Sequence, residues 1–290
     1  MRPQHTPHRF RWHPLALCLA TTILVAPPQA TQAGLFSVSP EQERKMGAQA
    51  AREIESKARI VRGPVADWVN IVGQRLASVS KSEWKYSFKV IDSPEVNAFA
   101  LPGGYVYVYT GLRKVAQTDD ELAAVLAHEI THAENHHYAQ QYKKASTRGA
   151  LLSVFSLAVG LPNYANQILG LIDYSRTQKY SRTHEYESDR LGVERMVRAG
   201  FDPQGMVTLL EKMSKEDRGT GTLTGWMRSH PEGRARVEAV QRTLTEVKTQ
   251  QAQNNPLVKP KYAPWTSETL QQLAYPTEAA PPPSAETSTP

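Results

Sequence analysis

The chain has 290 residues, 40% of them hydrophobic and 21% charged, which is the composition of a soluble protein with one large or two small domains. Its formal net charge of +6 falls to +3 without the three arginines of the first 33 residues. So small a charge, with no basic and aromatic cluster, argues against nucleic acid as a partner.

Residues 1–33 have the features of a secretory signal peptide. The amino end is basic, Leu15 to Ala26 form an apolar run of 12 residues, and small residues precede Gly34. A membrane-spanning helix needs about 20 apolar residues, so we expect cleavage and a periplasmic location rather than an uncleaved anchor. The only cysteine, Cys18, lies in this segment, so the mature chain would have neither a disulfide nor a thiol nucleophile.

Two packing helices are predicted next. Ser39 is an N-cap, Pro40 takes the first helical position and Gln42 closes a capping box, so a helix should run from here to about residue 59. A second helix follows Pro64 and carries an apolar stripe on one side.

A small sheet should follow these helices. The expected strands cover 84–91, 97–100 and 105–109, with a turn at 101–104. An extended substrate could add itself as a strand to the edge of this sheet, and the candidate substrate-binding residues there are Asn97, Gly103 and Gly104. The alternative interpretation is a purely structural hairpin.

The stretch from Glu121 to His137 contains the pattern His-Glu-x-x-His at 128–132. Thr118 and Glu121 form a capping box, which predicts that the stretch is a helix. On a helix His128 and His132 share a face and can hold one metal ion, while Glu129 lies beside the ion as a general base for a metal-activated water. The pattern alone is weak, but the six histidines that remain after removal of 1–33 all lie between 128 and 230.

Residues 149–172 form the most apolar part of the mature chain. Pro162-Asn163 splits them, and neither half is long enough to span a bilayer. Three interpretations remain: a buried pair of helices, a mobile cover over the site, or a face that makes peripheral contact with a membrane.

A helix entered at residues 180–189 and ended by Gly200 offers the next metal-binding groups. Glu185 and Asp189 are four residues apart and share a face. One can bind the metal while the other accepts a hydrogen bond from a ligand imidazole. His184 faces differently and is expected on the surface.

Asp202-Pro203 should start another helix, residues 219–225 a flexible loop, and His230-Pro231 the last helix. His230 could donate a hydrogen bond to the oxyanion of the transition state, act as a fourth metal ligand in a resting state, or be a surface residue. Residues 255–290 are rich in proline, serine and threonine, and we predict an extended or disordered tail.

Two histidines and one glutamate most often bind zinc, and three protein ligands with one open position make a hydrolytic site. Zinc would lower the pKa of a water from ~15.7 to about 7, and Glu129 would take the water proton and deliver it to the leaving amine. The residues thus indicate a metallopeptidase with one zinc ion per chain.

Four stretches resemble the gluzincin zinc endopeptidases that include the CAAX prenyl protease and the periplasmic beta-barrel assembly-enhancing protease. They are VNAFALPGGYVYVYTGL, DELAAVLAHEITH, YSRTHEYESDRLG and SHPEGRARV, and the resemblance covers about residues 40–250. It implies that His128, His132 and Glu185 bind zinc, that Asp189 supports a ligand histidine, and that His230 is the family's His-Pro histidine. Ser188 stands where the family usually has Ala.

We therefore expect a mainly helical α+β metallopeptidase domain at 34–254, with a small sheet next to the metal-binding helix. The resemblance implies an endopeptidase for unfolded or misassembled envelope proteins, that is, polypeptide substrates under quality control. Residues 255–290 do not resemble the carboxyl-terminal helical-repeat domain of the beta-barrel assembly-enhancing protease, and we find no counterpart of the membrane spans of the prenyl protease, so we expect neither docking on assembly machinery nor a prenylated substrate. The alternative function is a chaperone-like or scaffolding factor for envelope protein assembly with a latent protease site. The sequence leaves the oligomeric state open.

Overall fold

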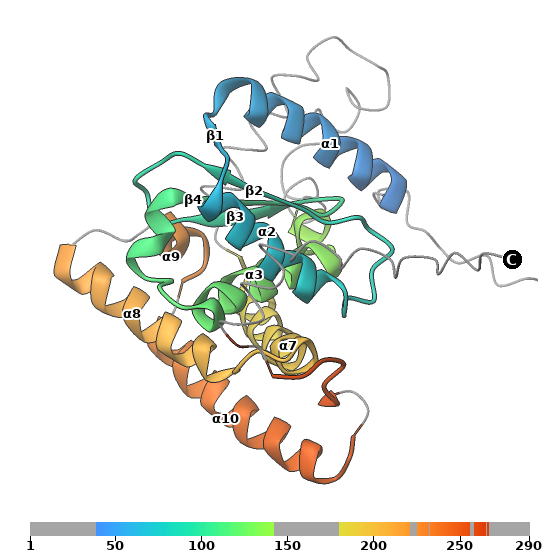
Figure 1. Ribbon diagram of the computed structural model, residues 1–290, viewed down its shortest axis with the longest axis vertical. Helices are drawn as coiled ribbons and strands as arrows, with labels where there is room; N and C mark the ends of the chain where they lie inside the picture. The colour runs from blue at the N-terminus through green and yellow to red at the C-terminus, as the bar shows by residue number, and fades with distance from the viewer. Residues whose placement is uncertain are drawn as a thin grey trace, which may run out of the picture. The chain divides into compact units, whose positions relative to one another are not determined.

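The computed structural model describes residues 39–141, 180–220, 225–231, 233–255, 258–264 and 266. The predicted signal peptide, the apolar segment 149–172 and most of the predicted tail lie outside these residues. Within them a four-stranded sheet is accompanied by helices from both halves of the chain, which confirms the expected α+β class (Figure 1).

The sheet has the strand order β1-β2-β4-β3. Its strands are β1 (Ile60–Val61), β2 (Ser87–Ile91), β3 (Ala98–Leu101) and β4 (Tyr105–Tyr109). β2 and β4 run parallel, and the two outer pairs are antiparallel. The strand order places β3 at one edge of the sheet and β1 at the other. The structure therefore adds a short strand, β1, that the sequence did not predict.

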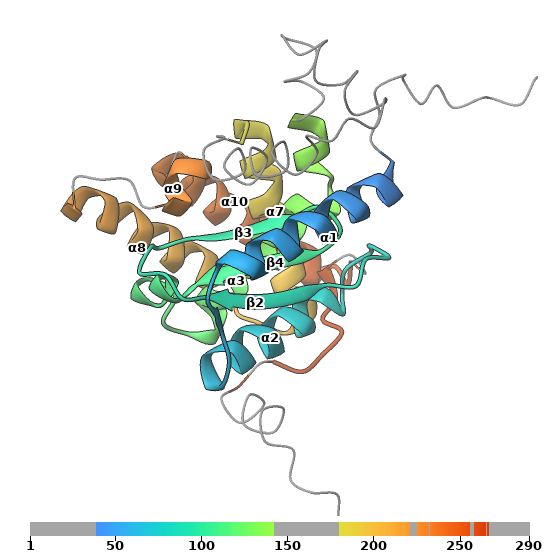
Figure 2. The same cartoon turned by 90° about the horizontal axis from the view of Figure 1, so that it is seen from above.

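Alternating residues of the strands pack into two cores. Val106 and Val108 point toward helices α2 (Pro64–Ala77) and α3 (Asp119–Glu134), whereas Tyr107 and Tyr109 point toward α1 (Pro40–Lys57). The sheet is consequently covered on both faces, with α1 on one side and α2 and α3 on the other (Figure 2). Both predicted capping boxes, Ser39 with Gln42 and Thr118 with Glu121, are present.

The later helices are α7 (Arg182–Ala199), α8 (Gln204–Thr220), α9 (Gly225–Ser229) and α10 (Gly233–Ala252). α7 and α8 pack on α3, and α10 packs on α7 and α8, with α8 and α10 side by side. A short 3-10 helix, η1 (Thr110–Lys114), joins β4 to the segment before α3. Gly200 ends α7 in the left-handed conformation, with φ of 86°, as its position in the sequence predicts.

The carboxyl-terminal part differs from the expectation in two details. The short helix α9 precedes His230, and the last helix, α10, begins at Gly233, just after His230-Pro231. Residues 258–264, assigned to the tail, contact the domain: Val258 is fully buried, and the carbonyl of Ala263 accepts a hydrogen bond from Arg75. The described residues of the predicted tail thus include a segment that packs on the domain.

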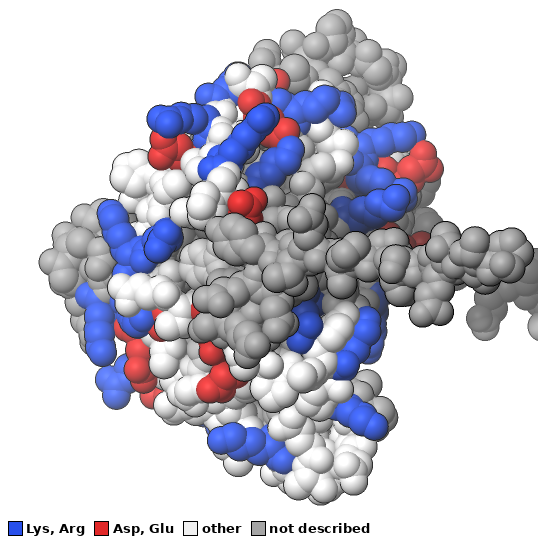
Figure 3. Space-filling view, in the orientation of Figure 1, with Lys and Arg blue, Asp and Glu red and all other residues white. Residues whose placement is uncertain are grey.

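No helix among the described residues is long and apolar enough to cross a membrane. Basic side chains are scattered over the visible face of the described residues, with acidic ones between them (Figure 3).

Candidate metal centre

Helix α3 brings the two histidines of the His-Glu-x-x-His pattern into the interior. Its residues from Glu121 to Ala133 are all buried, because α2 and the sheet cover one side of the helix and α7 and α8 cover the other. His128 and His132 lie one turn apart, and their Nε2 atoms approach to 2.9 Å. The exposed fraction of each of these two residues is at most 2%.

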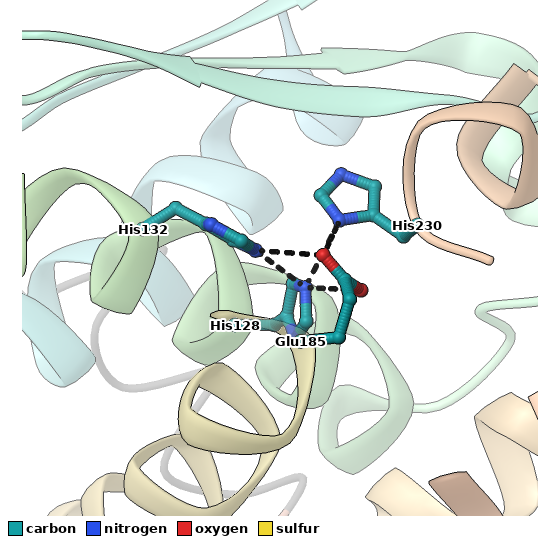
Figure 4. Close-up of side chains that lie close together, drawn as sticks. All are labelled: His128, His132, Glu185 and His230. Carbon is teal, nitrogen blue, oxygen red and sulfur yellow. Dashed lines mark hydrogen bonds and ion pairs between the residues drawn. The ribbon is translucent and has the colours of Figure 1, made fainter. Parts of the chain in front are cut away.

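Helix α7 supplies the carboxylates predicted from their spacing. Glu185 Oε1 lies 3.4 Å from His132 Nε2, and Glu185 Oε2 lies 3.6 Å from His128 Nε2. The segment after α9 supplies His230, whose Nδ1 lies 3.0 Å from Glu185 Oε1 and 3.2 Å from His128 Nε2. The four side chains point toward one another from three elements (Figure 4).

Each of these four residues offers one ligand atom, and the four atoms all lie within 4.8 Å of one another. Two ligands of a tetrahedral zinc ion, each about 2.1 Å from the metal, are about 3.4 Å apart. The five closest contacts in the cluster span 2.9 to 3.6 Å. The donor set, three imidazole nitrogens and one carboxylate oxygen, therefore fits zinc in both chemistry and spacing.

Asp189 supports the cluster from the side opposite the ligand atoms. Its Oδ1 lies 2.9 Å from His128 Nδ1, the arrangement that fixes the tautomer and orientation of a ligand histidine. Arg236 from α10, which is fully buried, donates from Nε and Nη2 to the two oxygens of Asp189 at 2.7 Å and places Nη1 2.7 Å from Glu185 Oε2.

The charges of this group control its ionisation. Burial alone would raise the pKa of Glu185, but His230 and Arg236 hold it well below its usual value. Burial opposed by Arg236 and His128 likewise leaves the pKa of Asp189 below its usual value. Burial lowers the pKa of His132 well below that of a free histidine, so this imidazole is neutral and can bind a metal.

Glu129 lies next to the cluster, with one carboxylate oxygen toward the sheet edge and one toward α9. Its Oε2 accepts a hydrogen bond from the backbone N–H of Ala100 at 3.1 Å. Its Oε1 accepts one from the indole N–H of Trp226 at 3.0 Å and lies 3.4 Å from His230 Nε2. Two hydrogen bonds thus hold the carboxylate beside the ligands, where a general base is needed.

The proposed substrate-binding residues divide into two groups. Asn97 immediately precedes the edge strand β3, and its side chain accepts a hydrogen bond from the N–H of Ala98. Gly103 and Gly104 have φ of 82° and 91° in the β3–β4 turn, where they are buried against Arg44 and Tyr86 respectively. Both glycines thus adopt the positive φ that the turn requires, and their contact with substrate stays a prediction.

The expectation that His184 lies on the surface is wrong. Its side chain is buried and stacks on the ring of His137 with centroids 4.2 Å apart. The sequence analysis also gave no role to Trp226, Arg236 or His137. The stretch SHPEGRARV contains two arginines, Arg234 and Arg236. Only their positions on the helix distinguish them: Arg236 is buried and Arg234 is exposed.

A model of peptidase family M48 matches residues 65–244, a range that contains every residue of this centre. The chain is 30% identical over 215 residues to the beta-barrel assembly-enhancing protease of Escherichia coli (strain K12), a match that covers 71% of this chain and 44% of the relative. It is 33% identical over 214 residues to the mitochondrial metalloendopeptidase OMA1 of Schizosaccharomyces pombe, covering 72% of this chain and 63% of the relative. The chain thus spans about half the length of the curated relatives it matches.

Proposed function

This chain belongs to peptidase family M48, and on that basis we propose that it is a zinc-dependent endopeptidase acting on unfolded or misassembled proteins of the cell envelope. The observation that carries the proposal is the position of Glu129. A carboxylate held beside four converging metal-binding side chains, and not counted among them, is suited to acid–base chemistry on a water next to the metal.

The residues of the centre would act as metal ligands, as a general base and as supports for the ligands. His128, His132 and Glu185 would hold one zinc ion, which would supply Lewis-acid chemistry for the scissile carbonyl and for an attacking water. Glu129 would accept the proton of the attacking water and deliver it to the leaving amine. Asp189 and Arg236 keep His128 and Glu185 oriented, so that both protonation state and geometry are set before substrate arrives.

The edge strand β3 offers a binding surface for an extended polypeptide. The N–H of Tyr109 donates to the carbonyl of Asn97, so in this antiparallel pair the backbone polar groups of Ala98 and Ala100 point away from β4. A substrate strand could pair with this edge beside Glu129 once the N–H groups of Ala98 and Ala100 leave their present acceptors, the side chains of Asn97 and Glu129. Such pairing requires an extended chain, which favours unfolded substrates.

The envelope location rests on two supports. The curated relatives include beta-barrel assembly-enhancing proteases from several bacteria, and residues 1–33 have the composition of a secretory signal. Other relatives carry mitochondrial names, so the location is part of the proposal.

A second candidate function is a chaperone-like or scaffolding factor with a latent protease site, and His230 favours it. Its Nδ1 lies among the ligand atoms, in the position of a fourth ligand rather than of a donor to an oxyanion. In addition, α9 is held against the sheet by the N–H of Trp226, which donates to the carbonyl of Val96 just before β3. With His230 as the fourth ligand, the coordination shell of the zinc ion would be complete. Substrate could then reach the metal only after α9, which precedes His230, has moved.

The experiment that tests the proposal compares one envelope β-barrel protein in its unfolded and refolded forms as substrate for the purified mature chain. We expect internal cuts, mapped by mass spectrometry, in the unfolded form only, and none with Glu129→Gln. Cutting only at chain ends, or equal cutting by Glu129→Gln, would contradict an endopeptidase that uses Glu129. Binding of the unfolded form without any cutting, by both proteins, would favour the scaffolding function.

A further inference from the structure

We infer that His137 is a positioning residue for the metal site: it holds the ligand His132 and connects it to the carboxylate of Glu187 at the protein surface. The inference rests on the proposed zinc site. It concerns a histidine that lies outside the His-Glu-x-x-His pattern and is not one of the four converging side chains.

The two ligand histidines of α3 are supported differently. His128 faces the cluster with Nε2 and turns Nδ1 to the carboxylate of Asp189, the usual partner of a metal-binding histidine. His132 also faces the cluster with Nε2, but its Nδ1 lies 3.0 Å from Nδ1 of His137. A second imidazole therefore takes the place that a carboxylate takes for His128.

The protons of this contact can be placed in only one order when a metal is bound. A neutral histidine that binds a metal through Nε2 carries its proton on Nδ1, so His132 donates and His137 accepts at Nδ1. His137 then carries its own proton on Nε2, which lies 3.1 Å from Oε2 of Glu187 and donates to it. In the hydrogen bonds from His132 to His137 and from His137 to Glu187, each donor thus meets an acceptor.

The surroundings of His137 suit this role. Its side chain is fully buried, so its two ring nitrogens must find their hydrogen-bond partners inside the protein. The ring of His184 packs flat on it, and the hydroxyl of Ser188 lies 3.4 Å from the same Nδ1. Glu187, whose side chain is 40% exposed, brings the end of the line to solvent.

Two substitutions at this position separate hydrogen bonding from packing. His137→Phe keeps a ring that can stack on His184 but removes the acceptor for His132, whereas His137→Asn keeps an acceptor near Nδ1 and removes the ring. We expect His137→Phe to weaken zinc binding about 10- to 100-fold, measured by competition with a chelator, and His137→Asn to restore most of the affinity. The visible spectrum of the cobalt-substituted protein should change in the Phe variant and resemble the wild type in the Asn variant.

A second pair keeps the inference testable if His137→Phe does not fold. Glu187→Gln should weaken zinc binding about two- to tenfold, while Glu194→Gln, the same change on the same helix away from His137, should leave it unchanged. Wild-type affinity in both His137→Phe and Glu187→Gln, or a loss confined to the unfolding temperature of the metal-free protein, would overturn the inference. A wild-type protein that binds no zinc would instead contradict the proposed function.

Discussion

Arg236→Met offers a quantitative test of how the centre is held together. In the metal-free protein Arg236 is the buried cation that faces the carboxylates of Asp189 and Glu185, each about 1% exposed. Burial alone would lower its pKa, and these two carboxylates raise it above that of a free arginine. Methionine removes the charge while keeping a long apolar side chain, so the variant removes the arginine that pairs with both buried carboxylates and leaves Glu185 with His230.

Breaking a buried ion pair by removing one partner costs about 3–5 kcal/mol of unfolding free energy. For a domain of this size each kcal/mol shifts the melting temperature by about 2–4 °C, so metal-free Arg236→Met should melt about 6–20 °C below the wild type. Zinc brings two positive charges to the same carboxylates and should recover much of this loss. Thermal unfolding followed by circular dichroism, with and without saturating zinc, measures both values.

Arg195→Met is the matched control. Arg195 is also buried on α7 and pairs with Glu134, and it donates to the carbonyl of Ala127 on α3, but it touches none of the ligands. Its loss should lower the melting temperature equally with and without zinc. If Arg236→Met showed the same equal loss, the argument that Arg236 compensates the charge of the ligand carboxylates would be refuted.

His230→Ala should keep its zinc and cleave casein faster than the wild type, because a fourth ligand is removed; slower cleavage would instead assign His230 to the transition state. Asp189→Asn should weaken zinc binding about 10- to 100-fold in a chelator competition, since His128 loses a charged acceptor, and unchanged affinity would count against that support. Burial raises the pKa of Glu121, but the ion pair with Lys212 holds it below 4.5, so this contribution to stability is complete above pH 4.5 and is lost as the pH falls through the lowered pKa of the folded state. Urea unfolding of Lys212→Met and wild type should therefore differ at pH 7 and converge once the pH is below the lowered pKa of Glu121 in the folded state; a difference independent of pH would show that the ion pair is not responsible.

Local signals in the sequence were sufficient to predict which side chains on helices face the candidate metal site. The capping box at Thr118 and the spacing of His128 and His132 predict both a helix and a shared face, and the structure has both. Glu185 and Asp189 follow from the same four-residue spacing, and their two different positions, one at the cluster and one behind His128, agree with the interpretation of one ligand and one support.

The supporting contacts could not be predicted in the same way, because they join residues that are far apart in the chain. Trp226 contacts Glu129 across 97 residues, and Arg236 contacts Asp189 across 47. His184 was misplaced for the same reason, since its burial depends on the position of His137 after the end of α3. The position of β3 at the edge of the sheet could not be predicted either, because strand order depends on the crossover that places β4 between β2 and β3.

The central claim is that this chain is a zinc peptidase whose base is Glu129. The most direct test is to measure zinc content and cleavage of unfolded casein on the same preparations of the mature wild type and Glu129→Gln. The account predicts one zinc ion per chain in both proteins, with cleavage by the wild type that a chelator abolishes and none by the variant. A wild type that lacks stoichiometric metal, or a variant that cleaves as fast as the wild type, would contradict it.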